Sequence, residues 1–466
     1  MEFMRHLALL LLVCGVFVPA GSRGRKLPLP DPAQLEWQDA ELAALVCWDL
    51  HVFDGKRYRQ GANRVTPIPD YNIFNPKQYD MDQWIRVLKT AGFKVAILTV
   101  THETGFALYQ SDVNPYCMKA LKWREGKGDI FRDFVNACRK YGISPGVYIG
   151  IRWNAFLGVH DFMMPKDHSE FQKNRQFYYN RMCEGMTREL MTRYGDLSVV
   201  WYDGGGHGPE LGGPDVLPIV EHYQKKIIFY HNSEKAGIRW GGSETGRVDY
   251  PCWGSYPFPY SHSKNQKVIF KNGFRLLKRG DPNGAYYMPA MGDFPLRGTR
   301  GRHEWFWEPG DEKTLYPLGR LMTIYRNCVG RNATLIGGIT PDDRGLIPDC
   351  DARRLEEFGT EINRLYGKPF REVPVQDGKA TLTFDRPQTL SHLVIQEDIA
   401  RGERVRAYQI EALRGGKWTR IAAGSCIGHK RIEWLGKPIP VNGLRFTVTR
   451  SEGPARIKRL ALFSTR

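Results

Sequence analysis

Residues 199–206 have the sequence VVWYDGGG, a short apolar run that ends on one carboxylate, Asp203, followed by three glycines. A short apolar run bounded by turn residues predicts a buried strand. Such a strand would hold Asp203 at its carboxyl end, and the glycines would let a ligand approach the backbone closely. In a parallel α/β barrel, catalytic groups lie at that end of the strands. The alternative is an ordinary strand end with an Asp-Gly turn, and the flanking sequence decides between the two.

Apolar strand patterns alternate with helical patterns on both sides of this stretch. Alternation over this length predicts a (β/α)8-like barrel of the TIM type with some irregular units. Further strands are expected at residues 42–53, 94–100, 145–151, 227–230 and 333–339, with less clear ones at 250–253 and 286–290. Helices are expected at residues 81–88, 130–141, 171–194, 216–226, 315–328 and 350–366.

The pattern changes near Pro369, where short segments begin to alternate apolar and polar residues without any helical spacing. This change predicts a catalytic barrel at residues 21–368 followed by an all-β sandwich domain at residues 369–466. The strands of the sandwich are expected at residues 380–384, 390–396, 405–412, 418–422, 444–448 and 457–463.

Residues 1–20 have the pattern of a secretory signal peptide. Arg5 and His6 precede an apolar run at residues 7–18, and small residues follow up to Ala20. That order of basic, apolar and small residues is typical of a cleaved signal. We therefore expect a secreted protein, located outside the cell, in a lysosomal or other lumenal compartment, or in the periplasm. The remaining chain has no apolar run of the roughly 20 residues that a membrane span needs.

Charge and cysteine usage make some functions improbable. Eight cysteines beyond the signal segment are scattered without a CxxC or His/Cys cluster, so we expect no metal, and disulfides and buried thiols remain alternatives. The formal net charge is +17, yet no nucleic-acid motif accompanies the basic residues. We expect no nucleic-acid partner, and the basic balance favours either acidic glycans or solubility alone.

Polar side chains follow several of the predicted barrel strands: Asp49, His51, His102, Glu103, Arg152, Asp203 and His231. Each alone is compatible with a structural role, but their convergence at strand ends favours one site at the carboxyl face. A retaining glycosidase needs two carboxyl groups about 5–5.5 Å apart. Asp203 is the first candidate, and Glu244, in a glycine-flanked loop at residues 238–246, is the second. The competitors of Glu244 are Glu234, Asp293 and Glu304.

Motifs spread over nearly all of the mature sequence resemble those of one known family. They are the strand at residues 199–204, the helix and strand around residues 74–94, and the strand and loop at residues 330–348. In combination they resemble the nucleophile strand, the first helix with the second strand, and the last barrel strand of glycoside hydrolase family 29, the α-L-fucosidases. The resemblance implies an exo-acting retaining α-L-fucosidase with Asp203 as nucleophile. It also implies a fucosylated oligosaccharide or glycoconjugate as substrate and no cofactor.

The loop RWGGSETG at residues 239–246 resembles the acid/base loop of one subgroup of that family. This subgroup prefers branched α-1,3/1,4-linked fucose, and the resemblance implies Glu244 as the acid/base. The predicted sandwich, including residues 427–432, also resembles the accessory module of that subgroup.

Two positions depart from the family pattern. Residues 47–49 are CWD where the family usually has His-Trp-Gly, and residues 102–106 are HETGF where it has His-His-Asp-Gly-Phe. Of three histidines that hold the sugar hydroxyls, His102 alone remains, so hydroxyl recognition must differ. One alternative is therefore a related exo-glycosidase for another L-sugar or a galactoside-like ring. A catalytically silent glycan-binding protein is a further alternative, against which the two carboxylates speak.

We expect aromatic and polar side chains around the barrel mouth to bind the sugar. The candidates are Trp48, Asp49, His51, His102, Glu103, Trp201, Tyr202, Trp253, Asp293, Arg297 and Trp305.

Overall fold

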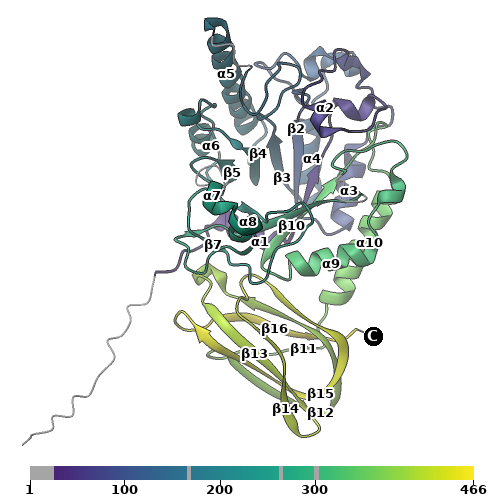
Figure 1. Cartoon of the computed structure of the whole chain (residues 1–466). Helices are drawn as coiled ribbons and strands as arrows, with labels where there is room; N and C mark the ends of the chain where they lie inside the picture. Colours follow the sequence, from purple (N-terminus) through teal and green to yellow (C-terminus); the bar gives the residue numbers. More distant parts are fainter. Residues whose placement is uncertain (1–25, 165–168, 262–265, 299–303, 466) are drawn as a thin grey trace, which may run out of the picture.

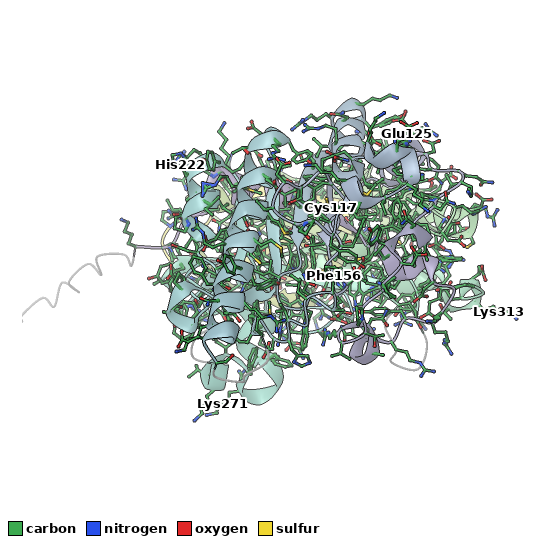
Figure 2. All side chains as sticks on the ribbon, turned by 90° about the horizontal axis from the view of Figure 1, so that it is seen from above. Cys117, Glu125, Phe156, His222, Lys271 and Lys313 are labelled. Atoms are coloured by element: carbon green, nitrogen blue, oxygen red, sulfur yellow. The ribbon has the colours of Figure 1, made fainter. Side chains whose placement is uncertain are left out.

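The computed structural model describes residues 26–164, 169–261, 266–298 and 304–465. The predicted signal peptide lies outside these residues. The described chain forms a barrel with a β-sheet domain packed beneath it (Figure 1). Figure 2 looks down on the molecule from above and shows Lys271 at its edge.

Eight parallel strands form the barrel sheet, which confirms the predicted fold class. Hydrogen bonds join them in the order β5-β4-β3-β2-β1-β10-β9-β6. β5 and β6, at the two ends of this order, are not hydrogen-bonded to each other as strands. The barrel is therefore nearly closed, with a seam between these two strands. The strands are β1 (Leu42–Val46), β2 (Val95–Thr101), β3 (Ser144–Ile149), β4 (Val199–Gly206), β5 (Ile228–Asn232), β6 (Arg239–Trp240), β9 (Ala290–Pro295) and β10 (Ala333–Ile339).

The longer helices surround these strands (Figure 1). Their ends follow the capping residues of the sequence: Asp129 accepts a hydrogen bond from the backbone N–H of Arg132, and Gly142 ends the same helix at φ 67°,. The helices are α1 (Pro32–Ala40), α2 (Gln60–Asn63), α3 (Met81–Thr90), α4 (Ile130–Tyr141), α5 (Glu170–Arg193), α6 (Leu217–Tyr223), α7 (Gln266–Ile269), α8 (Lys271–Arg279), α9 (Leu318–Cys328) and α10 (Asp349–Tyr366).

The first predicted strand is shorter than its apolar run. β1 ends at Val46, and residues 50–53 form a short 3-10 helix. Asp49 causes this change, since its side chain accepts a hydrogen bond from the backbone N–H of Leu50 and caps the turn,.

The sixth barrel strand was predicted in the wrong place. Residues 250–253 form no strand, and β6 occupies two residues that the sequence pattern placed in a loop. The predicted strand at residues 286–290 divides into β8 (Tyr286–Tyr287), which pairs antiparallel with β7 (Ser255–Tyr256), and the start of β9. A two-residue strand carries too little periodicity to be recognised in a sequence.

Six antiparallel strands form the C-terminal domain, in the order β11-β16-β12-β15-β13-β14. β12 and β15 lose register midway, and β16 pairs with the second half of β12 while β13 pairs with the second half of β15. The two long strands therefore pass from one layer to the other, and both layers share one apolar core. The strands are β11 (Arg371–Glu372), β12 (Lys379–Glu397), β13 (Val405–Arg414), β14 (Lys417–Gly424), β15 (Arg431–Ser451) and β16 (Ile457–Phe463).

Polar contacts join the sheet domain to the barrel. The backbone N–H of His429 donates to Oδ1 of Asn332 at 2.6 Å, and Nδ2 of Asn332 donates to Glu403 at 2.6 Å. His429 also contacts Asp39 near the end of α1 at 2.8 Å. These contacts, made by a buried asparagine beside β10, fix the base of the barrel and leave its opposite end for the site.

Candidate active site

One pocket collects side chains from five of the eight barrel strands and from the loops that follow them. Its volume is about 60 Å³, so it is a small hollow rather than a long cleft. The lining residues are Leu45, Cys47, Tyr58, Gln60, Thr99, His102, Glu103, Tyr148, Trp201, Asp203, Glu244, Asp293 and Trp305.

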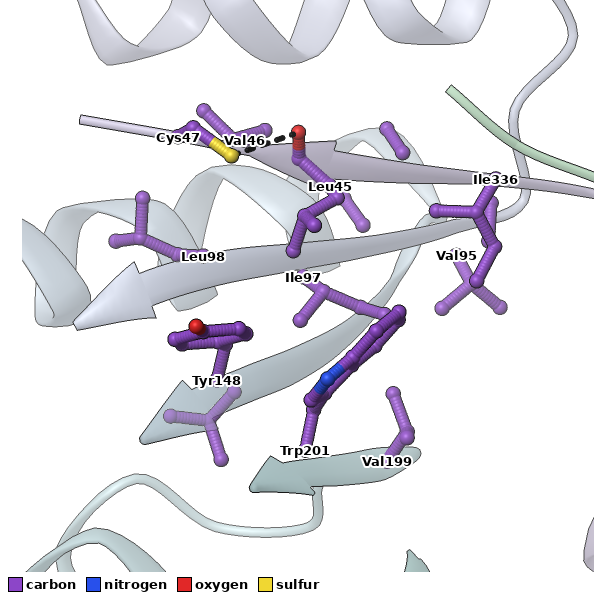
Figure 3. Close-up of a cluster of buried hydrophobic side chains, with 14 of the residues drawn as sticks. Leu45, Val46, Cys47, Val95, Ile97, Leu98, Tyr148, Val199, Trp201 and Ile336 are labelled. Carbon is purple, nitrogen blue, oxygen red and sulfur yellow. Dashed lines mark hydrogen bonds between the residues drawn. The ribbon is translucent and has the colours of Figure 1, made fainter. Parts of the chain in front are cut away.

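The floor of this pocket is built from β1 to β4. In Figure 3 the side chains of Leu45 on β1, Tyr148 on β3 and Trp201 on β4 point into the space between these strands. The indole N–H of Trp201 and Nδ1 of His102 are buried without a hydrogen-bond partner among the described residues. Buried polar atoms without partners are rare in folded proteins. These two atoms on the pocket wall therefore suit a polar ligand such as a sugar hydroxyl.

Asp203 lies where β4 departs from regular pairing. The register with β5 passes from Trp201 opposite Tyr230 directly to Gly206 opposite Asn232. Gly204 and Gly205 have φ values of 69° and 85°, which side chains disfavour. The glycines therefore permit an irregular turn that leaves the Asp203 side chain accessible within the pocket.

Arg152 lies directly against this turn. A Cβ atom added to Gly204 would stand 2.5 Å from Nη1 of Arg152, so glycine alone leaves room for the guanidinium. Nε of Arg152 donates to Asp161 at 2.7 Å, which fixes its position. Removal from water within the site raises the pKa of Asp203 above its ordinary value, and the charge of Glu244 raises it further. The charges of His102 and Arg152 lower this pKa. Arg152 thus favours the ionised form of the carboxylate.

Glu244 enters the pocket from the loop that follows β6. Nε1 of Trp305 donates to Oε2 of Glu244 at 3.1 Å. Asp293 on β9 holds both ends of this loop: Nε1 of Trp240 donates to its carboxylate at 2.8 Å, and the backbone N–H of Gly246 donates to its carbonyl at 2.8 Å. The loop is therefore held by two side-chain hydrogen bonds and one backbone hydrogen bond rather than by a long paired strand.

Asp293 is itself buried in this cluster of carboxyl groups. Burial raises its pKa well above the ordinary value, and the neighbouring charge of Glu244 adds to the shift. A protonated Asp293 places no second negative charge beside Glu244. The other competitors of Glu244 do not line the pocket: Glu234 is exposed in the turn after β5, and Glu304 is buried elsewhere.

The two departures from the family pattern both line the pocket. Glu103 accepts hydrogen bonds from Tyr58 at 2.6 Å and from Nε of Arg64 at 2.7 Å, so each of its oxygens has a protein donor. Burial, followed by the charge of Asp203, raises the pKa of the Cys47 thiol. The thiol is thus neutral and protonated at ordinary pH. The Cys47 thiol donates to the carbonyl of Leu45 at 3.8 Å, and Glu103 is engaged in holding the adjacent loop.

Two predicted sugar-binding aromatics face away from the pocket. Nε1 of Trp48 donates to the carbonyl of Asp342 at 3.1 Å, and its ring packs against Trp84 of α3. The hydroxyl of Tyr202 contacts Thr187 of α5 at 2.9 Å. Side chains alternate between the faces of a strand, so the inward direction of Trp201 places its neighbour Tyr202 outside the barrel.

Four further predicted positions are also absent from the pocket lining. Asp49 accepts a hydrogen bond from the hydroxyl of Thr104, and His51 packs against the rings of Tyr58 and Phe306. Trp253 lies 4.9 Å from the guanidinium of Arg406 in the sheet domain. Arg297 is buried and forms ion pairs with Asp311 and Asp351. None of these side chains lines the pocket. Their contacts instead stabilise loops and the junction between the two domains.

The pocket also contains residues that the sequence pattern did not single out. Leu45, Thr99 and Tyr148 are inward positions of predicted strands, so strand alternation was an available signal. Tyr58 and Gln60 come from the long loop after β1, where no periodic pattern indicates which side chains face a ligand.

Within the part of the chain that the structure describes, no three His, Cys, Asp or Glu side chains are grouped to hold a metal ion. The eight described cysteines form no disulfide with one another. None of the described helices combines the length and apolar character that crossing a membrane requires.

Comparisons with known proteins point in one direction. A family model described as Alpha-L-fucosidase matches residues 33–365. Alpha-L-fucosidase 1 of Arabidopsis thaliana is 25% identical over 477 residues, which covers 94% of this chain and 88% of that protein. The plasma alpha-L-fucosidase of Rattus norvegicus is 30% identical over 297 residues, covering 62% of this chain and 55% of the rat protein.

Solved structures agree with the sequence relatives. The crystal structure of a putative alpha-L-fucosidase from Bacteroides thetaiotaomicron is 54% identical, with a TM-score of 0.91, and covers 94% of this chain and 100% of that chain. A fucosidase of Ruminococcus gnavus in complex with fucose has the same fold at 20% identity and a TM-score of 0.78. That alignment covers 94% of this chain and 95% of the other.

Proposed function

The chain belongs to the α-L-fucosidase family, glycoside hydrolase family 29, and we propose that it removes terminal α-linked L-fucose with retention of configuration. The observation that carries the proposal is the position of two carboxyl groups, Asp203 and Glu244, in the wall of one small pocket. They come from different sides of the barrel, as a nucleophile and an acid/base on two sides of a bond require.

The proposed reaction is a double displacement. Asp203 attacks the anomeric carbon while Glu244 protonates the leaving glycosidic oxygen, so one bond to Asp203 forms as the bond to the leaving group breaks. Glu244 then removes a proton from water, which attacks the anomeric carbon and releases Asp203. Asp203 must be ionised for the first step, and the nearby charge of Arg152 supports that state.

The shape of the pocket supports removal of one terminal residue. The pocket is a small hollow rather than a long cleft, which favours binding of a chain end over binding of the interior of a chain. The unpaired N–H of Trp201 and the unpaired Nδ1 of His102 are the proposed partners of the sugar hydroxyls. The ring of Trp305, which lies over Gly338 at the end of β10, is the proposed contact for the apolar face of the sugar.

One observation favours a second candidate glycone. Cys47 and Glu103 line the pocket at positions where the resemblance implies hydroxyl-binding histidines, and Glu103 is already engaged by Tyr58 and Arg64. A related L-sugar or a galactoside-like ring is therefore the alternative substrate. A silent glycan-binding role has no need for the paired carboxylates.

A panel of aryl glycosides tests this proposal. We expect hydrolysis of an aryl α-L-fucoside, with the α-anomer of fucose as the first product by NMR. Faster turnover of an α-L-galactoside or another sugar would identify the second candidate. A first-formed β-anomer would contradict the retaining mechanism.

The proposed linkage preference is branched α-1,3/1,4-linked fucose, supported by the likeness of the loop that carries Glu244. Matched oligosaccharides with α-1,2- and α-1,3/1,4-linked fucose distinguish it, and equal rates would contradict it. We also propose that the protein is secreted through the signal pattern at residues 1–20. Detection of a mature N-terminus near residue 21 in the exported protein tests this.

A further inference from the structure

A strongly basic segment lies outside the pocket. Residues 251–280 contain six Lys or Arg and no Asp or Glu. This segment includes α7 and α8, which follow the loop bearing Glu244. The acidic residues nearest in sequence, Asp249 and Asp281, stand at the two ends of this stretch.

The helix α8 arranges part of this charge along one groove. Lys271, Arg275 and Arg279 are four residues apart in sequence, and the left-handed residues Gly273 and Phe274 (φ 63° and 64°) separate the first from the other two. All three line a hollow of about 350 Å³ that also contains Trp253 and Pro251. Lys271 lies at the edge of the molecule, where it is open to solvent (Figure 2).

The positive charge of the groove is only partly neutralised. Arg279 pairs with Asp249 at 3.2 Å. Lys271 and Arg275 are exposed and form no ion pair with the described residues. Two of the three cations that line the groove therefore remain available to a bound anion.

The groove is separate from the catalytic pocket but shares an element with it. A Cβ atom added to Gly242 would stand 3.0 Å from both Lys278 and Phe274 of α8. One side of α8 therefore supports the loop that carries Glu244, whereas the side with Lys271 and Arg275 borders the groove. No residue lines both the groove and the pocket.

We propose that the groove beside α8 binds an anionic glycan chain, through sulfate or carboxylate groups spaced along the chain. Three cations that line one hollow suit successive charges on a polymer better than one small anion. The membership of the chain in a glycoside hydrolase family favours a glycan over a nucleic acid. Nucleic-acid grooves also present aromatic rings for stacking, whereas Trp253 is 6% exposed. Only the choice of a glycan as the bound polymer rests on the proposed function.

Binding to immobilised heparin, a sulfated and carboxylated polysaccharide, tests the proposal with the mature protein. We expect the Lys271→Gln/Arg275→Gln variant to bind about fivefold more weakly at low salt and to elute at lower salt. The matched control, Lys77→Gln/Lys89→Gln, removes two exposed charges from another part of the barrel and is expected to bind like the wild type.

A second readout separates the groove from the pocket. Hydrolysis of a small aryl α-L-fucoside is expected to be unchanged in the Lys271/Arg275 variant, because neither residue lines the pocket. Equal heparin binding by this variant and the wild type, or equal loss in the control, would overturn the proposal. Tighter binding to single-stranded DNA or to anionic lipid vesicles than to heparin would overturn the choice of a glycan. Heparin binding by a protein without any glycosidase activity would support the groove as a binding site and would contradict only the proposed function.

Discussion

The two sides of the pocket are built in different ways. Asp203 lies in the eight-residue strand β4, two residues beyond Trp201, which pairs with both β3 and β5. Glu244 follows the two-residue strand β6 at the seam of the barrel, and its loop is held by Trp305 and by the side chain and backbone carbonyl of Asp293. The sheet therefore anchors the chain two residues before the attacking group, whereas a few hydrogen bonds outside the sheet hold the loop of the proton donor. Substitutions on the two sides should consequently differ in size and in character.

The largest effect is expected for Asp203→Asn. The amide cannot form the glycosyl-enzyme, so kcat/KM for an aryl α-L-fucoside should fall by about 10⁴-fold or more. The fold should persist, because the Asp203 side chain is accessible and caps no element. Circular dichroism controls for folding, and a loss below about tenfold would assign the nucleophile elsewhere.

Glu244→Ala should give a large effect that depends on the leaving group. Loss of the acid should slow hydrolysis of a fucosylated oligosaccharide by about 10²- to 10⁴-fold. An aryl fucoside with an acidic phenol needs little protonation and should lose far less in its first step. Azide should restore turnover of that substrate. Equal losses for both substrates, without rescue, would contradict the acid/base assignment.

Arg152→Gln should alter the pH profile on the nucleophile side. Arg152 opposes the raised pKa of Asp203, so its loss should raise that pKa further. Since only ionised Asp203 attacks, the acidic limb of kcat/KM should move to higher pH. Activity at the acidic end should fall about tenfold, with near wild-type activity well above the limb. Arg152→Lys should lie between the two, and an unshifted limb would refute this role.

The smallest effect is expected for Trp305→Phe on the acid/base side. Phenylalanine keeps an aromatic ring but loses the N–H that donates to Glu244. Loss of one hydrogen bond should lower kcat for an oligosaccharide about 3- to 10-fold. The aryl fucoside with a good leaving group should be nearly unaffected. An equal fall for both substrates would indicate a role in sugar binding instead.

The contrast between the two sides also explains what the sequence could predict. β4 and Asp203 were recognisable because an apolar run, one carboxylate and three glycines follow in order. The sequence also predicted six of the eight barrel strands and the change to β structure near Pro369. β6 was missed because two residues show no period. Glu244 was therefore a candidate because of its glycine-flanked loop, and the likeness of that loop, rather than strand spacing, distinguished it from its competitors.

Sugar-binding residues were harder to predict than the catalytic pair. Trp201 and Tyr202 are neighbours of one chemical class, yet only the first lines the pocket, because strand alternation separates them. Strand alternation does not explain why Arg297 and Trp253 lie outside the pocket. Their positions depend on partners distant in sequence, Asp351 for Arg297 and Arg406 for Trp253, and no local pattern reveals these contacts.

The central claim is that Asp203 forms a covalent bond to the sugar. Incubation with an activated 2-deoxy-2-fluoro-L-fucoside should trap this intermediate, because fluorine slows its hydrolysis. Peptide mass spectrometry should then place one fluorofucosyl group on Asp203, and the Asp203→Asn variant should remain unlabelled. A label on Glu244, Asp293 or any other residue would contradict the account.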